Sequence, residues 1–207
     1  MSLLTNWGYT LTGADALTDF LTDEEFDAFT AGKFDGDARI APSIKSVSQA
    51  VRNYCGWHLY PSLACQMRAA LSDKRVTMVS WDILIQLPAR YVSEVTSVTI
   101  DGTEYSTFTL ETNGTLRVYD VQALLHRYSE IVIDYIAGLP EGLMGAIKEL
   151  AANRVTHALA SSYGVTSEAA GGVSITYNAS WAGNTRATAL TDDSKEVLTP
   201  YRLEGVF

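Results

Sequence analysis

The sequence predicts an α+β protein in which a small helical bundle carries an inserted, mostly antiparallel β-domain and an extended C-terminal arm. Apolar residues recur every three or four positions near 41–56 and again near 141–163, which is the spacing of one face of a helix. Between these two segments, apolar and polar residues alternate as they do in half-buried strands. Asp-Gly and Asn-Gly pairs in the same stretch are typical of hairpin turns.

The predicted organisation is one structural unit with four parts. They are acidic N-terminal helices over 1–40, a helical core over 41–59 and 138–164, the inserted β-domain over 60–137, and the C-terminal arm over 165–207. The chain has 207 residues, of which 47% are hydrophobic and 19% charged, so its composition is that of a folded protein with a core.

Acidic residues are concentrated at the N-terminus. Residues 1–37 contain eight acids and one base, and therefore carry seven of the nine net negative charges. Within them, LTDEEF (21–26) is a capping box, in which Thr22 accepts from the backbone N–H of Glu25 and Glu25 reaches back. We expect Gly32 to end this helix. A solvated, well-capped helix explains the acids, and an acidic surface does not favour specific nucleic-acid binding.

The next helix is predicted over 41–56, with Pro42 at its first position. One apolar stripe runs along it, formed by Ile44, Val47, Val51, Tyr54 and Cys55. Gly56 follows where a left-handed residue commonly ends a helix, so we expect a positive φ there and a buried Cys55.

Two hairpins are predicted with their registers. Asp101-Gly102 favours a two-residue type I′ turn that pairs Ile100 with Thr103. In FTLETNGTLRV (108–118), a two-residue turn would mix the two faces. A three-residue loop with Gly114 left-handed keeps them separate and pairs Leu110 with Leu116 and Phe108 with Val118.

Other elements follow from the same patterns. EIVIDYIAG (130–138) is apolar enough for a central strand, and VTMVSWDILIQL (76–87) provides one or two more. Residues 141–164 form the longest predicted helix, with one stripe of Leu143, Ile147, Leu150, Ala151 and Ala158 and a second of Val155 and Leu159. The tail adds a short strand around 173–177 and a short helix near 192–198.

The tail is rich in small polar residues and yet contains several aromatic ones. Such a segment either orders against a partner or wraps its own domain. For the first alternative, the expected partner-interface residues are Tyr177, Trp181, Tyr201 and Arg202.

Cys55 and His58 stand three residues apart and raise the question of metal binding or thiolate chemistry. The other candidates are Cys65, His126 and His157, and neither C-x-x-C nor H-E-x-x-H spacing occurs. A Cys–His nucleophile would also need an orienting group and an oxyanion hole. We therefore expect no catalytic, metal or cofactor-binding residues, a buried and inert Cys55, and a packed or hydrogen-bonded His157.

The N-terminal sequence MSLLTNWGYT lacks the features of a signal peptide, and no apolar run is long enough to span a bilayer. With only two cysteines, we expect a soluble protein made in a cytoplasm.

Several short motifs, in order, resemble the head–tail connector (head-completion or adaptor) proteins of long-tailed double-stranded DNA phages and prophages. The likeness covers roughly 40–203. The motifs are RNYCGWHLYPS (52–62), VTSVTIDGTEY (95–105), IVIDYIAGLP (131–140) with GLMGAIKELAANRV (142–155), SEAAGGVSITYN (167–178) and LTPYRL (198–203).

The resemblance implies a subunit of the head–tail neck of the virion, assembled in the host cytoplasm. It implies a homo-oligomeric ring, usually twelvefold, that docks beneath the portal protein and extends the DNA channel without specific DNA binding. The ring would offer a surface to a stopper or tail-completion protein.

The leading hypothesis is thus a non-enzymatic virion assembly protein with no cofactor and no membrane partner. One alternative is a ligand- or protein-binding module of a phage tail, or another soluble binding protein, in which the β-domain recognises its partner. Another is an enzyme that uses Cys55.

Overall fold

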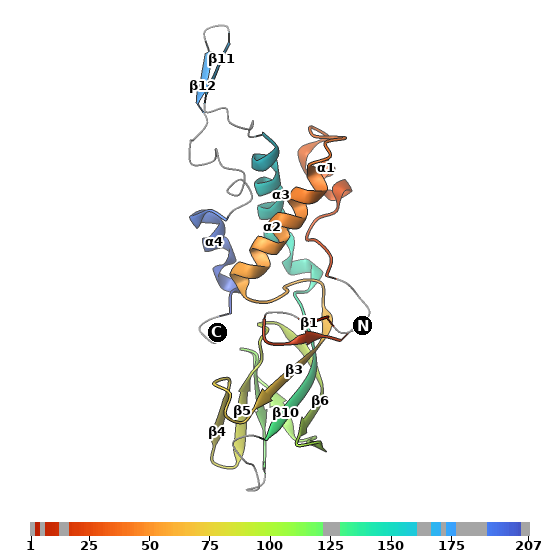
Figure 1. The fold of residues 1–207 in the computed structure, drawn as a ribbon, viewed down its shortest axis with the longest axis vertical. Helices are drawn as coiled ribbons and strands as arrows, with labels where there is room; N and C mark the ends of the chain where they lie inside the picture. Colours follow the sequence, from red (N-terminus) through yellow and green to blue (C-terminus); the bar gives the residue numbers. More distant parts are fainter. Residues whose placement is uncertain are drawn as a thin grey trace. The chain divides into compact units, whose positions relative to one another are not determined.

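The computed structural model describes residues 3–4, 7–12, 17–121, 129–160, 167–170, 173–176 and 190–203. The chain divides into two compact units. We call them the helical unit, Asp19–Tyr54 with Gly142–Pro200, and the β unit, Cys55–Glu141 with residues before Asp19 and after Pro200. The helices and strands confirm the predicted α+β class (Figure 1).

The helical unit contains α1 (Asp23–Thr30), α2 (Ile40–Cys55, whose last residue is counted with the β unit), η1 (Glu141–Leu143), α3 (Gly145–Ala160) and α4 (Asp192–Leu198). It also contains the hairpin β11 (Ser167–Ala170) and β12 (Val173–Thr176). Helix α3 contacts both α1 and α4. The predicted helix over 192–198 is confirmed, and the C-terminal arm is therefore present in part as α4.

Helix α1 begins as predicted. The Thr22 hydroxyl accepts from the backbone N–H of Glu25 at 3.2 Å, and the Glu25 carboxylate accepts from the backbone N–H of Thr22 at 2.9 Å. The left-handed turn that ends the helix starts one residue before the predicted Gly32, because Ala31 already has a φ of 52°. Phe26, on the inner face of α1, is fully buried.

Helix α2 confirms the predicted stripe, because Ile44, Val47, Val51 and Cys55 are buried while Tyr54 is half-buried. The helix begins at Ile40, so Pro42 stands in its first turn rather than at its first position. Proline is tolerated there because the N–H groups of the first turn have no partner within the helix. Gly56 has a φ of 79°, as predicted.

The second long helix begins later than predicted. A 3₁₀ turn comes first, α3 starts at Gly145, and Leu143 is 42% exposed instead of buried. The apolar positions on α3 itself, Ile147, Leu150, Ala151, Val155 and Leu159, are buried. Small side chains at Ala151 and Ala152 let neighbouring elements approach this helix closely.

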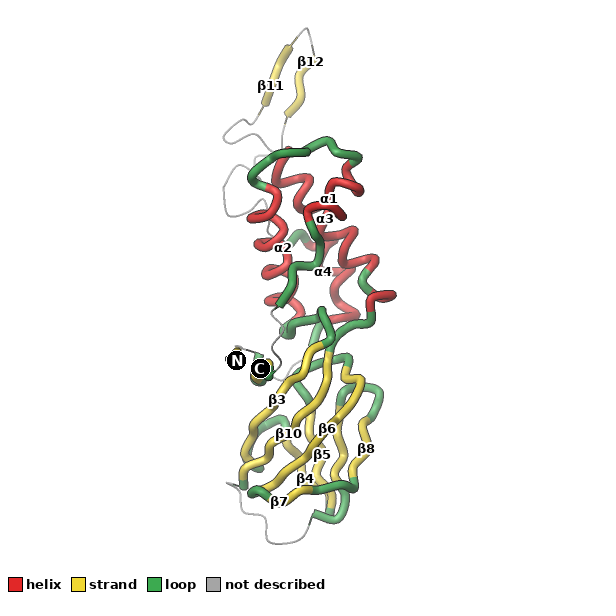
Figure 2. Tube along the Cα trace, turned by 90° about the vertical axis from the view of Figure 1, so that its right-hand side faces the viewer, coloured by secondary structure: helices red, strands yellow, loops and turns green. Residues whose placement is uncertain are grey.

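The β unit is built from two antiparallel sheets (Figure 2). One has the strand order β1 (Leu3–Leu4), β2 (Thr10–Leu11), β3 (Leu63–Ala70), β10 (Glu130–Ala137), β6 (Val92–Ile100) and β7 (Thr103–Glu104). The other has the order β4 (Val76–Val79), β5 (Asp82–Gln86), β9 (Thr115–Val118) and β8 (Phe108–Leu110). Buried side chains from both sheets form the core.

The predicted strand pairings are confirmed. Ile100 pairs with Thr103, and the turn residues Asp101 and Gly102 both have positive φ, as a type I′ turn requires. Phe108 pairs with Val118 and Leu110 with Leu116, around a loop in which Gly114 has a φ of 79°. Strand β10 is central, since it pairs with β3 on one side and β6 on the other.

The N-terminal residues correct one expectation. The sequence predicts short helices over 1–40, but the described part of that segment contains one helix, α1, and the strands β1 and β2. Trp7, Tyr9 and Leu11 are buried and the residues between them are not, which is the alternation of a strand. Strand β2 pairs with β3 and so extends the larger sheet.

Candidate functional site

The stretch around Cys55 and His58 holds two thiols that are not reactive. Cys55 and Cys65 are both buried, and burial raises the pKa of each to about 12 from an ordinary value of 9.0. Arg202 lowers the pKa of Cys55 slightly, but burial outweighs it. Because the thiolate is the nucleophile and the metal ligand, neither cysteine is available for such chemistry near neutral pH. The prediction that Cys55 is buried is confirmed.

His58 is fully buried and its two ring nitrogens have protein partners. Nε2 lies 2.8 Å from the backbone oxygen of Ala137, which can only accept, so Nε2 carries a proton. Nδ1 of the neutral ring then accepts from the Tyr9 hydroxyl at 2.6 Å, and that hydroxyl accepts from the backbone N–H of His58 at 3.0 Å. The network joins the N-terminal segment to the end of β10, and it occupies the nitrogen lone pair that a metal would need.

Trp57 lies beside His58 and is also fully buried. Its indole Nε1 donates to the backbone oxygen of Tyr201 at 2.8 Å, and the backbone N–H of Leu203 donates to the oxygen of Cys55 at 3.0 Å. The 50–61 stretch is thus a junction that holds the C-terminal residues of the β unit.

The described residues do not form a metal-binding cluster. No group of three or more His, Cys, Asp or Glu side chains there is placed to hold a metal ion. His157 is an exposed residue of α3, and His126 lies outside the described residues. None of the described helices is long and apolar enough to cross a bilayer.

The predicted interface residues are only partly described. Tyr177 and Trp181 lie outside the described residues. Tyr201 is half-buried, and the side chain of Arg202 is exposed while its backbone oxygen accepts from Arg90 Nη1 at 3.2 Å. In the helical unit, Leu198 of α4 is fully buried. Residues 190–203 therefore belong to the folded body, as in the alternative that the tail wraps its own domain.

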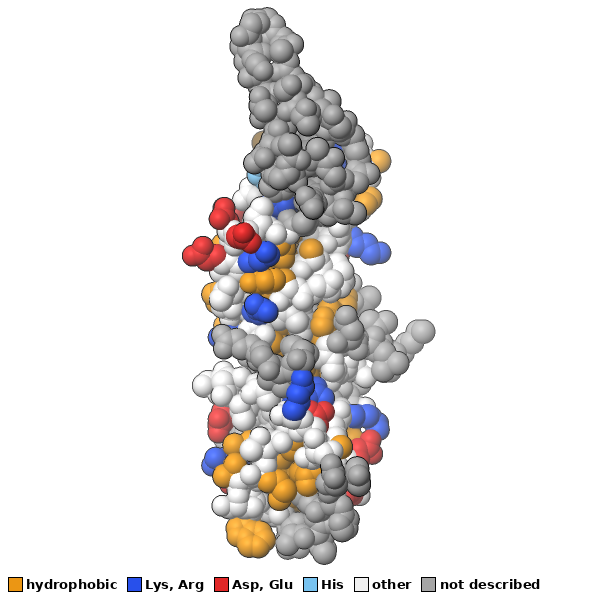
Figure 3. All heavy atoms as spheres, turned by 60° about the vertical axis from the view of Figure 1, so that its left-hand side comes forward, with side chains coloured by type: hydrophobic (Ala, Val, Ile, Leu, Met, Phe, Trp, Pro, Cys, Tyr) orange, Lys and Arg blue, Asp and Glu red, His pale blue; other side chains and the backbone are white. Residues whose placement is uncertain are grey.

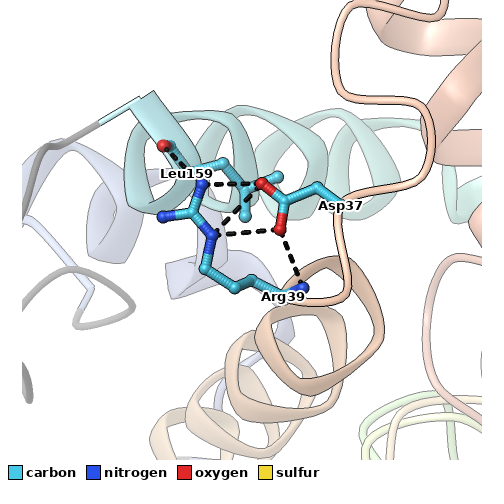
Figure 4. A network of polar contacts seen from close by, with 3 residues as sticks. All are labelled: Asp37, Arg39 and Leu159. Atoms are coloured by element: carbon cyan, nitrogen blue, oxygen red, sulfur yellow. Dashed lines mark hydrogen bonds and ion pairs between the residues drawn. The ribbon is translucent and has the colours of Figure 1, made fainter.

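In the helical unit, polar contacts of Asp37 and Arg39 link the residues just before α2 to the end of α3 (Figure 4). The carboxylate of Asp37 accepts from Arg39 Nη2 at 2.6 Å, from Nε at 3.0 Å and from the Arg39 backbone N–H at 2.9 Å. Arg39 Nη2 also lies 3.4 Å from the backbone oxygen of Leu159, near the end of α3. Hydrogen bonds from Arg39 lower the pKa of Asp37 to about 2.

Open hollows lie in both units of the described part of the chain. One of about 490 Å³ lies between α3 and α4, lined by Glu149, Asn153, Arg154 and His157 and by residues of α4. A second of about 290 Å³ lies between α1 and α3 and includes Phe29, which is 48% exposed. A third, of about 350 Å³ in the β unit, is lined by residues 90–92, 110–112 and 114.

An apolar patch in the β unit was not anticipated from the sequence. Met78, Val79 and Trp81 are 52%, 41% and 65% exposed, and they surround the turn between β4 and β5. Figure 3 shows hydrophobic side chains exposed on one face of the β unit. The signal in the sequence is Ser80-Trp81, a two-residue turn between two apolar strands, because a side chain at a hairpin turn has no core to enter.

The geometry of the described residues thus offers surfaces for protein contacts. No curated protein matches the chain in sequence. The family described as Head completion protein matches residues 19–202, which is most of the chain and includes the described helices α1 to α4 and the whole stretch from β3 to β10. The chain therefore belongs to the head completion protein family, the structural proteins of phage head assembly.

Proposed function

We propose that the protein is a head–tail connector subunit that forms a ring below the portal, extends the DNA channel and provides a docking surface for a stopper or tail-completion protein. The observation that carries the proposal is the family match over 19–202, which spans both units. The connector has no catalytic step, and its function is contact with copies of itself and with neighbouring virion proteins.

The charge distribution supports a role beside DNA. Asp23, Glu24 and Glu25 are exposed in the first turn of α1, within the segment that carries most of the net negative charge. If this face lines the channel, its acids repel the phosphates and let DNA pass without adhering. A ring lined by basic residues would instead hold the DNA.

For the contact with the portal, we keep Tyr177, Trp181, Tyr201 and Arg202 as the proposed interface. The support for Arg202 is its exposed side chain on a backbone whose oxygen accepts a hydrogen bond from Arg90. Residues 190–203 are folded in the chain by itself, so this part of the arm needs no ordering on binding.

The test is cryo-electron microscopy and native mass spectrometry of the full chain with its portal protein. We expect a ring on the portal, twelvefold if the portal is, and weaker docking of R202A. K45A is the matched control, because Lys45 is an exposed cation of α2 outside the proposed interface. A chain that stays monomeric and ignores the portal contradicts the proposal.

One observation favours the alternative of a binding module. The β unit has an exposed apolar patch, formed by Met78, Val79 and Trp81. It also has a hollow beside Tyr91 that could bind a ligand or a side chain of another protein. A phage-tail binding module predicts that W81A abolishes capture of a tail protein or carbohydrate while portal docking is absent in the wild type as well.

A further inference from the structure

The β4–β5 turn presents a hydrophobic knob, which we define as Met78, Val79 and Trp81. The three side chains are exposed at the edge of the four-stranded sheet, where β4 pairs with β5 alone. Residues 76–81 contain no charged side chain. Exposed apolar clusters of this kind mark surfaces that contact another molecule.

The Tyr91 hollow, which we define as the hollow lined by residues 90–92, 110–112 and 114, lies elsewhere on the same unit. The Tyr91 ring is 37% exposed and stacks on the buried Trp57 ring, with centroids 6.4 Å apart and an interplanar angle of 12°. The Trp57 indole donates a hydrogen bond to the backbone oxygen of Tyr201, which fixes the ring on which Tyr91 stacks.

The hollow fits an indole in size and in chemistry. Its volume is about 350 Å³, whereas a cavity of about 150 Å³ is enough for a benzene molecule. Tyr91 offers an aromatic ring for stacking, and the Arg90 guanidinium, fixed by the backbone oxygen of Arg202, offers a cation for the indole face. The exposed Glu111 carboxylate is an acceptor for the indole N–H.

The knob and the hollow lie at opposite ends and opposite edges of the four-stranded sheet. Ile83 pairs with Val118 next to the knob, and Gln86 pairs with Thr115 next to the 112–114 loop. The sheet order puts β4 at one edge and β8 at the other. The Trp81 of one chain is therefore not the side chain that fills its own hollow.

We infer that the knob of one copy inserts into the Tyr91 hollow of the next copy, so that the occupant of the hollow is a second copy of this chain. Two different surfaces on opposite edges make a head-to-tail contact, which closes into a ring when the rotation between copies allows. In such a ring every knob and every hollow is covered, whereas binding of a different protein to one surface leaves the other exposed. The uncharged knob also suits contact between chains that each carry a net charge of −9.

This inference rests on the proposed ring, and intermolecular disulfide formation tests it separately. We would place one new cysteine on each side of the contact in separate full-length chains, S80C beside the knob and T112C at the hollow. Both native cysteines are buried, with pKa values raised to about 12, so they do not compete. S80C also leaves the knob residues unchanged.

On the portal, a mixture of S80C and T112C is expected to give a disulfide-linked pair, while either variant alone gives none. T103C is the matched control, because Thr103 is exposed on β7 of the other sheet. The mixture of T103C and T112C is expected to remain uncrosslinked. Crosslinking of S80C to itself would show a symmetric knob-to-knob contact and overturn the inference.

A second measurement uses the knob itself. W81A is expected to lower ring occupancy on the portal at least tenfold, and W81F, which keeps an aromatic ring, by less. Rings that form normally with W81A, or that form without the S80C–T112C disulfide, overturn the contact and leave the connector function standing. If the wild-type chain forms no ring with its portal, the proposed function fails, and the contact with it.

Discussion

The indole Nε1 of the buried Trp57 donates a hydrogen bond to the backbone oxygen of Tyr201, 144 residues further along the chain. Together with the bond from Leu203 to Cys55, it fastens the C-terminal residues to the β unit. Of the arm, the structure describes the β11–β12 hairpin and the folded residues 190–203.

Leu198 of α4 is expected to be a core residue. It is fully buried in the helical unit, so L198A should lower the free energy of unfolding by about 2–5 kcal/mol. V197A, at the adjacent position that is 45% exposed, should change it by no more than about 0.5 kcal/mol. Urea denaturation followed by circular dichroism measures both, and equal effects would mean that α4 does not pack as described.

The Tyr9 hydroxyl is expected to stabilise the β unit through His58. Y9F removes the partner of two buried groups, the His58 backbone N–H and Nδ1, and should lower the free energy of unfolding by about 1–3 kcal/mol. Y105F is the control, because Tyr105 is only half-buried in the same unit. Denaturant titrations measure the free energy of unfolding of both variants, and equal values for Y9F and Y105F would contradict the role of the network.

Gly114 and Gly102 form a matched pair for substitution by alanine. Both have a positive φ, of 79° and 78°. A Cβ on Gly114 would lie 2.7 Å from the backbone oxygen of Ala89, whereas a Cβ on Gly102 would meet nothing within 4 Å. Each change carries the left-handed penalty of about 1–2 kcal/mol, and G114A should cost more because of the clash. Thermal unfolding that ranks G102A as the less stable variant would contradict this.

The pKa of the Asp37 carboxyl, lowered to about 2 by Arg39, makes the helical unit sensitive to acid. A lowered pKa means that the contribution to stability is present above about pH 4 and is lost as the pH falls toward 2. D37N should therefore lower the unfolding temperature at pH 7, and the difference from wild type should shrink toward pH 2. Because Asp37 is only half-buried and its partner Arg39 is exposed, solvent screens the pair and the change will be small; D35N, at an exposed aspartate nearby, is the control.

The two buried cysteines are expected to make the folded protein less stable at high pH. Their pKa values are raised by burial, so the folded protein holds them protonated while the unfolded chain ionises above about pH 9. Their contribution to stability is complete below pH 9 and is lost as the pH rises toward 12. At pH 8, a thiol reagent should label neither cysteine in the native protein and both in denaturant; rapid native labelling would contradict their burial.

The local elements of the fold could be predicted because local chemistry decides them. The Asn113-Gly114 loop was assigned three residues by matching the faces of its strands, and the Thr22 capping box needs only four consecutive residues. The strand around Tyr9 could not be separated from its acidic neighbours, since its pairing partner in β3 lies more than 50 residues away. Whether Leu198 packs inward or faces a partner depends equally on distant residues.

The candidate interaction surface was harder to predict than the fold. From the sequence, Trp81 is expected to be a core residue, because it stands in an apolar run. It is exposed because the chain turns at Ser80, where φ is 58°. His58 shows the opposite case. Its spacing from Cys55 suggests a metal ligand, but both of its ring nitrogens form hydrogen bonds within the protein, with the Tyr9 hydroxyl and the Ala137 carbonyl.

The hydrogen bond from Leu203 to Cys55 also sets an order of events during synthesis. The β unit takes in residues from both ends of the chain, and this bond can form only once residue 203 has left the ribosome. A nascent or prematurely terminated chain lacks the segment that covers Trp57, beneath the stacked Tyr91. The surface proposed for assembly is thereby completed only in chains that extend to residue 203, so shorter products are poorly suited to enter a particle.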